Sequence, residues 1–183
     1  MKNWCEQIEK NTQDFLETFG GLSDEQLNWK PNPQTWSIGQ NIDHLIVINS
    51  SYFPVIDSIR KGTYKRPFLA KLGFVVSFMG NMVLTAVQPD RKNKMKTFPM
   101  WEPAKSEIPF GILYRFKTHQ SELKDIIVQS KDLVEKGTII SSPANRNIVY
   151  KLEQAFDIII AHEQSHFEQS KEIYRLMKKE TNS

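Results

Sequence analysis

Residues 152–177 read LEQAFDIIIAHEQSHFEQSKEIYRLM, a stretch without proline or glycine. Apolar side chains and histidines recur along it at three- and four-residue spacings, which is the period of one face of an α-helix. The members of this stripe are Leu152, Ala155, Ile159, His162, His166, Ile173 and Met177. We predict a long helix from about Asn147 to the end of the chain, with two histidines in its apolar stripe.

His162 and His166 are separated by four residues, so their rings lie one turn apart on the same helical face and can hold one metal ion together. The segment also matches H-E-x-x-H, the pattern of zinc proteases, in which Glu163 would act as general base toward a water activated by the metal. Such a protease needs a third ligand further along the chain, and no histidine follows His166. We therefore expect a metal site but not a protease.

The third ligand has to come from another part of the chain, which offers two further histidines. His44 follows Asn41 at helical spacing in a second predicted helix, so it can point inward from a neighbouring helix and is the better third ligand. Three neutral imidazoles leave a position open for water or substrate, as in catalytic metal sites. We expect Asn41 to reach the same pocket and Asp43 to face solvent. His119 has no ligand-spaced partner, and we expect it to be exposed or to cap a helix.

Helical spacing elsewhere predicts three more helices, and no segment alternates over enough residues to require a sheet. Ser37 and Gln40 form a capping-box pattern at the start of one of them, and Pro54 is expected to kink or restart that helix. The three helices are expected over residues 3–19, from Ser37 to about Arg60, and from about Phe110 to near Gly137. With the last helix they form an all-α four-helix bundle, in a single domain that spans residues 1–183.

The middle of the chain, from Gly62 to Pro109, is the least regular part. Its apolar run Leu72–Val87 is shorter than the roughly 20 apolar residues that cross a bilayer. We expect a buried or interfacial helix there and no membrane partner, and the run also suits a contact between two copies in a homodimer. The basic cluster Arg91–Lys96 is expected to be a solvated loop rather than a phosphate site.

Composition fits one ordinary globular domain. The chain has 183 residues, with 39% hydrophobic and 25% charged residues. A net charge of +3 is far from the concentrated positive field of a dedicated nucleic-acid binder, so no nucleic-acid partner is expected. The single cysteine, Cys5, cannot form an internal disulfide, and Met1–Gln7 does not begin an export signal. Both features favour a cytoplasmic protein.

Three stretches of the chain resemble the DinB/YfiT-like superfamily: WKP at 29–31, WSIGQNIDHL at 36–45 and AHEQSHFEQ at 161–169. They follow one another in the order of the family and span most of the chain. The resemblance implies an up-down-down-up four-helix bundle in which His44, His162 and His166 bind one divalent metal ion, with nickel, zinc and iron all seen. The long middle segment 62–109 is a departure from the shorter members, and it leaves the substrate open.

Characterised members of the family resemble metal-dependent thiol S-transferases and isomerases that use bacillithiol, mycothiol or glutathione. The leading expectation is therefore a cytoplasmic metalloenzyme that transfers a thiol such as bacillithiol to an electrophilic small molecule. The first alternative is a metal-dependent hydrolase in which Glu163 is the general base, although Glu163 could instead support a ligand imidazole. The second alternative is a non-catalytic, metal-binding bundle in dimerisation or a stress response.

Overall fold

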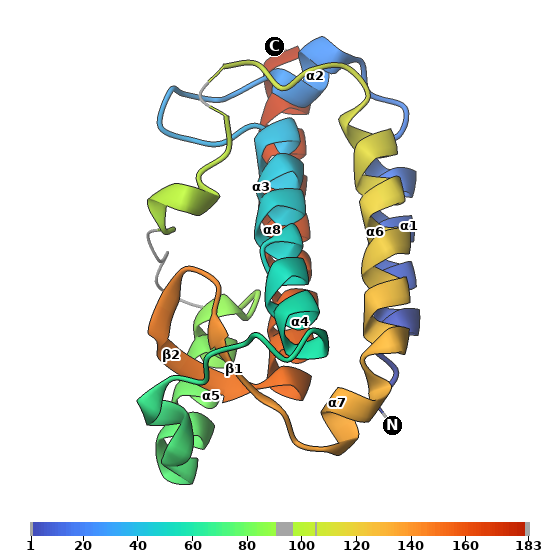
Figure 1. Ribbon diagram of the computed structural model, residues 1–183. Coiled ribbons are helices and arrows are strands. Elements are labelled where there is room, and N and C mark those ends of the chain that lie inside the picture. Colours follow the sequence, from blue (N-terminus) through green and yellow to red (C-terminus); the bar gives the residue numbers. More distant parts are fainter. Residues whose placement is uncertain (1, 91–96, 105, 182–183) are drawn as a thin grey trace.

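The computed structural model of the chain describes residues 2–90, 97–104 and 106–181. Four long helices form its centre: α1 (Trp4–Phe19), α3 (Ile38–Ser50), α6 (Ile112–Gln129) and α8 (Leu152–Thr181). α1 and α8 run in one direction, and α3 and α6 run in the other (Figure 1). The predicted all-α four-helix bundle and its up-down-down-up connectivity are therefore confirmed.

Capping boxes set the starts of α2 (Asp24–Asn28) and α3. At α3 the Ser37 hydroxyl accepts a hydrogen bond from the Gln40 backbone N–H, and the Gln40 side chain accepts one from the Ser37 backbone. The helix predicted to run as far as Arg60 is divided into α3 and α4 (Phe53–Arg60). Pro54 lies in the first turn of α4, where its missing N–H costs nothing, so the chain restarts the helix at the predicted place.

A two-stranded antiparallel hairpin precedes α8 and was not predicted. It pairs β1 (Ile139–Ser142) with β2 (Asn145–Lys151), and α8 begins at Leu152 rather than near Asn147. The buried side chains of Ile140 and Tyr150 lie opposite each other in the register, so burial of β-branched and aromatic residues favours the strands. A strand of four residues is too short to show alternation in the sequence.

The helix predicted from Phe110 to Gly137 is also two helices, α6 and α7 (Lys131–Glu135). Phe110 precedes α6 and is 87% exposed, which contradicts its assignment to the apolar face of this helix. The residue before α6 is Gly111, whose φ of 79° is left-handed and favours glycine. This turn directs Phe110 away from the bundle.

The middle segment contains η1 (Phe68–Lys71), α5 (Gly73–Val87) and η2 (Pro99–Trp101). One side of α5 packs against α8 and β2, with Val76 and Gly80 buried, and its other side is exposed. A Cβ at Gly80 would lie 2.4 Å from the Gln154 side chain, so this close approach requires glycine or movement of Gln154. The basic cluster Arg91–Lys96 lies outside the described residues. Of the helices described, none has both the length and the apolar character needed to cross a membrane.

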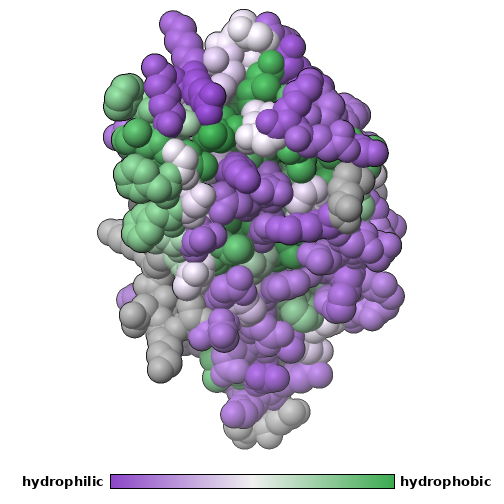
Figure 2. Space-filling model, turned by 90° about the horizontal axis from the view of Figure 1, so that it is seen from below, coloured by the Kyte–Doolittle hydropathy of each residue, from purple (hydrophilic) through white to green (hydrophobic). Residues whose placement is uncertain are grey.

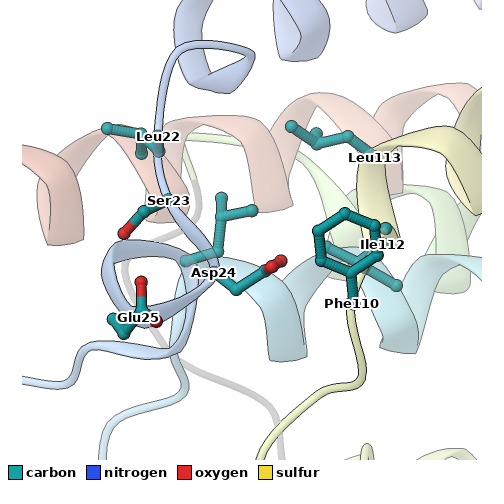
Figure 3. A pocket seen from close by; sticks show the side chains of 9 residues that line it. Leu22, Ser23, Asp24, Glu25, Phe110, Ile112 and Leu113 are labelled. Carbon is teal, nitrogen blue, oxygen red and sulfur yellow. The ribbon is translucent and has the colours of Figure 1, made fainter.

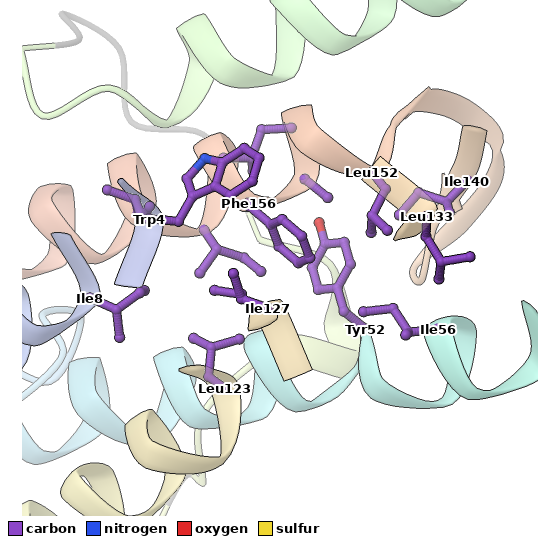
Figure 4. Close-up of a cluster of buried hydrophobic side chains, with 14 of the residues drawn as sticks. Trp4, Ile8, Tyr52, Ile56, Leu123, Ile127, Leu133, Ile140, Leu152 and Phe156 are labelled. Carbon is purple, nitrogen blue, oxygen red and sulfur yellow. The ribbon is translucent and has the colours of Figure 1, made fainter. Parts of the chain in front are cut away.

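The bundle has two apolar clusters separated by buried polar residues. Figure 4 shows the first cluster, in which Trp4 and Ile8 of α1 pack near Phe156 of α8. In the second cluster the ring of Phe15 lies 5.0 Å from that of Phe116 and 5.1 Å from that of Phe167. Along α1, α6 and α8 the residues between these clusters are polar and buried, and they include both histidines of α8.

Candidate metal centre

The three predicted ligand histidines come together between α3 and α8. His44 is 2% exposed, His162 is 7% exposed and His166 is 3% exposed. One ring nitrogen from each lies within 4.8 Å of the other two, and the Nε2 atoms of His162 and His166 are 3.0 Å apart. Two nitrogens bound to one tetrahedral zinc ion are about 3.3 Å apart. The cluster therefore has the size that a single metal ion requires.

The backbone carbonyl of Trp101 determines which ring nitrogen of His44 carries the proton. The Nδ1 atom of His44 lies 2.5 Å from this backbone oxygen, which can only accept a hydrogen bond. Nδ1 therefore carries the proton, and in the neutral ring the lone pair is on Nε2. A neutral imidazole with its other nitrogen held in this way is the usual form of a metal ligand.

The side chain of Asn41 determines which ring nitrogen of His166 carries the proton. Asn41 therefore reaches the site, as expected. Its Oδ1 atom lies 2.6 Å from Nδ1 of His166, and its Nδ2 atom donates to the backbone carbonyl of Ser37 at 2.9 Å. The bond to Ser37 orients the amide, so Oδ1 must be the atom that faces the ring. His166 therefore donates through Nδ1 and presents the Nε2 lone pair.

Replacing Asn41 with alanine should weaken metal binding by about 10- to 100-fold without removing any ligand, because the orientation and tautomer of His166 are then unsupported. Competition with a chromophoric chelator measures the change in affinity. Asn147→Ala removes an exposed asparagine of the hairpin and serves as the matched control. Equal metal affinity of the two variants would show that Asn41 does not support the ligand.

Two tryptophans contact the histidines, Trp36 through its ring and Trp101 through its backbone carbonyl, and only the tertiary contacts reveal these roles. The half-buried ring of Trp36 stacks on His166 at 6.0 Å between centroids and lies 5.0 Å from His44. Trp101 is 7% exposed, and its indole N–H donates to the Ser51 hydroxyl at 3.2 Å. The one sequence signal for Trp101 is its place between Pro99 and Pro103, which marks an ordered loop without indicating a site.

Asp43 is buried, contrary to the expectation that it faces solvent. Its Oδ1 atom accepts a hydrogen bond from the Arg115 guanidinium at 3.1 Å, which links α3 to α6. The partner is 72 residues away in the sequence. A carboxylate is tolerated at a buried position when it is paired, and helical spacing along α3 does not show the partner.

Glu163 lies in the interior of the bundle and is fully buried. Its carboxylate accepts hydrogen bonds from Nδ2 of Asn11 at 3.0 Å and from Nδ2 of Asn49 at 2.8 Å. Burial raises the pKa of Glu163 to about 7, and the amides of Asn11, Gln120 and Asn49 oppose this rise. The Glu163 carboxylate does not belong to the three-histidine cluster. Successive residues of a helix point about 100° apart, so Glu163 faces a different direction from His162. A general-base role for Glu163 stays a prediction.

His119 is buried, not exposed or capping as expected. It is 5% exposed, and its ring stacks on Phe53 with 5.6 Å between centroids. The Nδ1 atom lies 3.4 Å from the Ser50 hydroxyl, and Nε2 has no hydrogen-bond partner within the described part of the chain. Desolvation by burial lowers the pKa of His119 to about 4. The ring is therefore neutral near pH 7, and it is not part of the three-histidine cluster.

This burial predicts a pH dependence of stability. Between pH 6.5 and pH 4 the unfolded chain binds a proton at His119 and the folded chain does not, so stability falls as the pH falls. His119 should lower the free energy of unfolding by about 2 kcal/mol between pH 7.5 and pH 5. Urea unfolding of wild type and His119→Gln at both pH values measures this contribution as the difference between the two proteins. An identical pH dependence would contradict it.

A surface cavity of about 370 Å³ lies at one end of the bundle, between α2 and the start of α6 (Figure 3). It is lined by Leu22, Ser23, Asp24, Glu25, Leu27, Phe110, Gly111, Ile112 and Leu113. None of these residues belongs to the histidine cluster or makes the hydrogen bonds that orient it. The cavity and the candidate metal centre are therefore separate features.

Comparison with known proteins finds a matching family model and a distant relative. The model of the DinB superfamily matches residues 7–170, a range that contains all three histidines. The uncharacterized protein YuaE of Bacillus subtilis (strain 168) is 28% identical over 166 residues, which cover 86% of this chain and 91% of YuaE. No solved structure shows significant similarity.

Proposed function

The chain belongs to the DinB superfamily, and from this premise we propose that it is a metal-dependent enzyme that transfers a low-molecular-weight thiol to an electrophilic small molecule. The observation that carries the proposal is the convergence of three buried imidazoles, two of which are held through Nδ1. Three ring nitrogens within 4.8 Å of one another match the donor set and the size of a site for one metal ion. A binding role therefore explains the cluster better than a structural role does.

The donor set suits a divalent transition metal. Imidazole nitrogens favour zinc, nickel and iron over the hard cations magnesium and calcium. His44, His162 and His166 would supply three ligands and leave one position for a reactant. A divalent ion bound there would act as a Lewis acid toward a thiol sulfur and favour its thiolate at neutral pH.

The residues around the histidines support this chemistry by orientation and by exclusion of water. The Trp101 carbonyl and Asn41 hold two of the rings, so these rings do not have to reorient when a reactant binds. The indole ring of Trp36 lies against His44 and His166 and limits access of bulk water. Trp36 is only half-buried, so the electrophile would approach from its side.

A metal-dependent hydrolase ranks second because of where the carboxylate lies. Hydrolysis needs a base next to the attacking water, whereas transfer of a thiolate does not. The Glu163 carboxylate is held by Asn11 and Asn49 in the bundle interior, which favours a supporting role over proton transfer at the histidines. A non-catalytic metal-binding bundle would bind the ion and show no turnover.

The Glu163→Gln variant distinguishes the proposed thiol transferase from the proposed hydrolase. Metal-loaded protein should conjugate bacillithiol or a similar thiol to a reactive aryl or alkyl halide, with saturation in both reactants. The variant should keep its metal and at least about half of this activity, since no general base is required. The rate of conjugate formation, followed by chromatography, is the measurement.

The opposite pattern would reject the transferase. A metal-loaded wild type that conjugates no thiol from a broad panel, yet hydrolyses an ester or amide in a manner abolished by Glu163→Gln, would establish the hydrolase. If the protein binds metal stoichiometrically and turns over neither class of substrate, the non-catalytic metal-binding bundle is the function that remains.

A further inference from the structure

An exposed apolar stripe runs along the outer side of α5. Phe74, Phe78 and Met82 are spaced four residues apart on one helical face, and they are 76%, 68% and 48% exposed. Phe68 in η1 adds a fourth side chain that is 72% exposed. Figure 2 shows apolar residues gathered along its left side, the side on which α5 lies in Figure 1. These four residues are called the α5 apolar face below.

The size of this face matches the largest apolar patch of a typical single chain. Each exposed phenylalanine offers on the order of 150 Å² of apolar surface, so the four side chains together offer on the order of 500 Å². The largest apolar patch on a typical monomer is about 300–600 Å², and patches of that size are often interaction sites. The opposite side of α5 is packed on α8 and β2, so the helix is anchored and its exposed side faces outward.

Basic residues border the α5 apolar face at the N-terminal end of the helix. Residues 62–89 contain Lys65, Arg66 and Lys71 and no acidic residue. The Lys71 ammonium lies 5.6 Å from the centroid of the Phe68 ring. Lys65 and Arg66 are exposed, and Arg146 of β2 donates to the Lys65 carbonyl at 2.9 Å, which adds another basic group.

We propose that the α5 apolar face docks on the surface of an anionic lipid bilayer. Exposed phenylalanines enter the boundary between headgroups and acyl chains, and lysines and arginines beside them are attracted to anionic headgroups. A helix of this kind lies in the plane of the membrane, so it does not need the length of a membrane-spanning helix. A symmetric contact between two copies would instead join this segment to itself, and the segment has no acidic residue that could pair with its lysines and arginines.

Flotation with lipid vesicles tests the proposal on the full chain. The protein should bind vesicles of equal parts phosphatidylglycerol and phosphatidylcholine at low salt, and at least about tenfold more weakly vesicles of phosphatidylcholine alone. The double variant Phe74→Ser/Phe78→Ser should lose at least about tenfold in partitioning. Lys65→Glu/Arg66→Glu/Lys71→Glu should lose at least about tenfold as well.

Phe110→Ser is the matched control, because Phe110 is 87% exposed but lies beside Asp24 at the cavity near α2. It should bind within about twofold of wild type. Circular dichroism of each variant verifies that the fold is kept. Absence of binding to the anionic vesicles, or unchanged binding by the Phe74→Ser/Phe78→Ser variant, would overturn the proposal. So would a dimer in solution that this variant disperses without any vesicle binding, since the face would then serve a second copy.

Discussion

His166→Ala is expected to remove stoichiometric metal from the purified protein, from up to one divalent ion per chain in the wild type to background. The substitution removes one of three imidazole ligands, and it also removes the group that Asn41 orients. Two remaining imidazoles leave the ion bound at least about a hundredfold more weakly. Elemental analysis of protein purified without a metal-binding tag gives the ratio of metal to chain.

His119→Ala is the control for this experiment, because it also removes a buried histidine but one outside the cluster. It should keep its metal, while His44→Ala and His162→Ala should lose it. A His44 variant that retains the ion while the His119 variant loses it would mean that the ligand assignment is wrong. Circular dichroism separates loss of metal from loss of fold.

Glu163→Ala is expected to lower the free energy of unfolding by about 3 kcal/mol or more. The carboxylate is the acceptor for the side-chain amides of Asn11 and Asn49, and both amide donors are buried. Each buried donor left without an acceptor costs about 1–3 kcal/mol, and the cavity left by the truncation adds to this. Urea unfolding of the metal-free protein at constant pH measures the change.

Glu163→Gln should cost less, about 1–2 kcal/mol, because the glutamine oxygen still accepts one bond while its NH₂ group faces a donor. Glu168→Ala, on the exposed side of the same helix, should change stability by about 0.5 kcal/mol or less. If Glu163→Ala unfolded at the same urea concentration as Glu168→Ala, the amides must find other acceptors and the buried carboxylate would not stabilise the bundle.

The features that could be predicted from the sequence depend on relations between residues a few positions apart. The apolar stripe of α8 follows from the helical period, and the start of α3 follows from the reciprocal bonds of Ser37 and Gln40. His162 and His166 share a face because they are four residues apart on one helix. His44 could be matched to them because it is a histidine inside an apolar helical stripe, which is an uncommon place for an imidazole.

The features that could not be predicted depend on contacts between distant parts of the chain. The acceptor that orients His44 is the backbone carbonyl of a residue 57 positions away, and every residue type carries such a carbonyl. Asn11 and Asn49 read as ordinary polar residues until the packing of α1 and α3 against α8 places their amides on Glu163. A polar side chain is stable in the interior when its partners arrive from other helices, so its burial is a property of the packed bundle and not of its own helix.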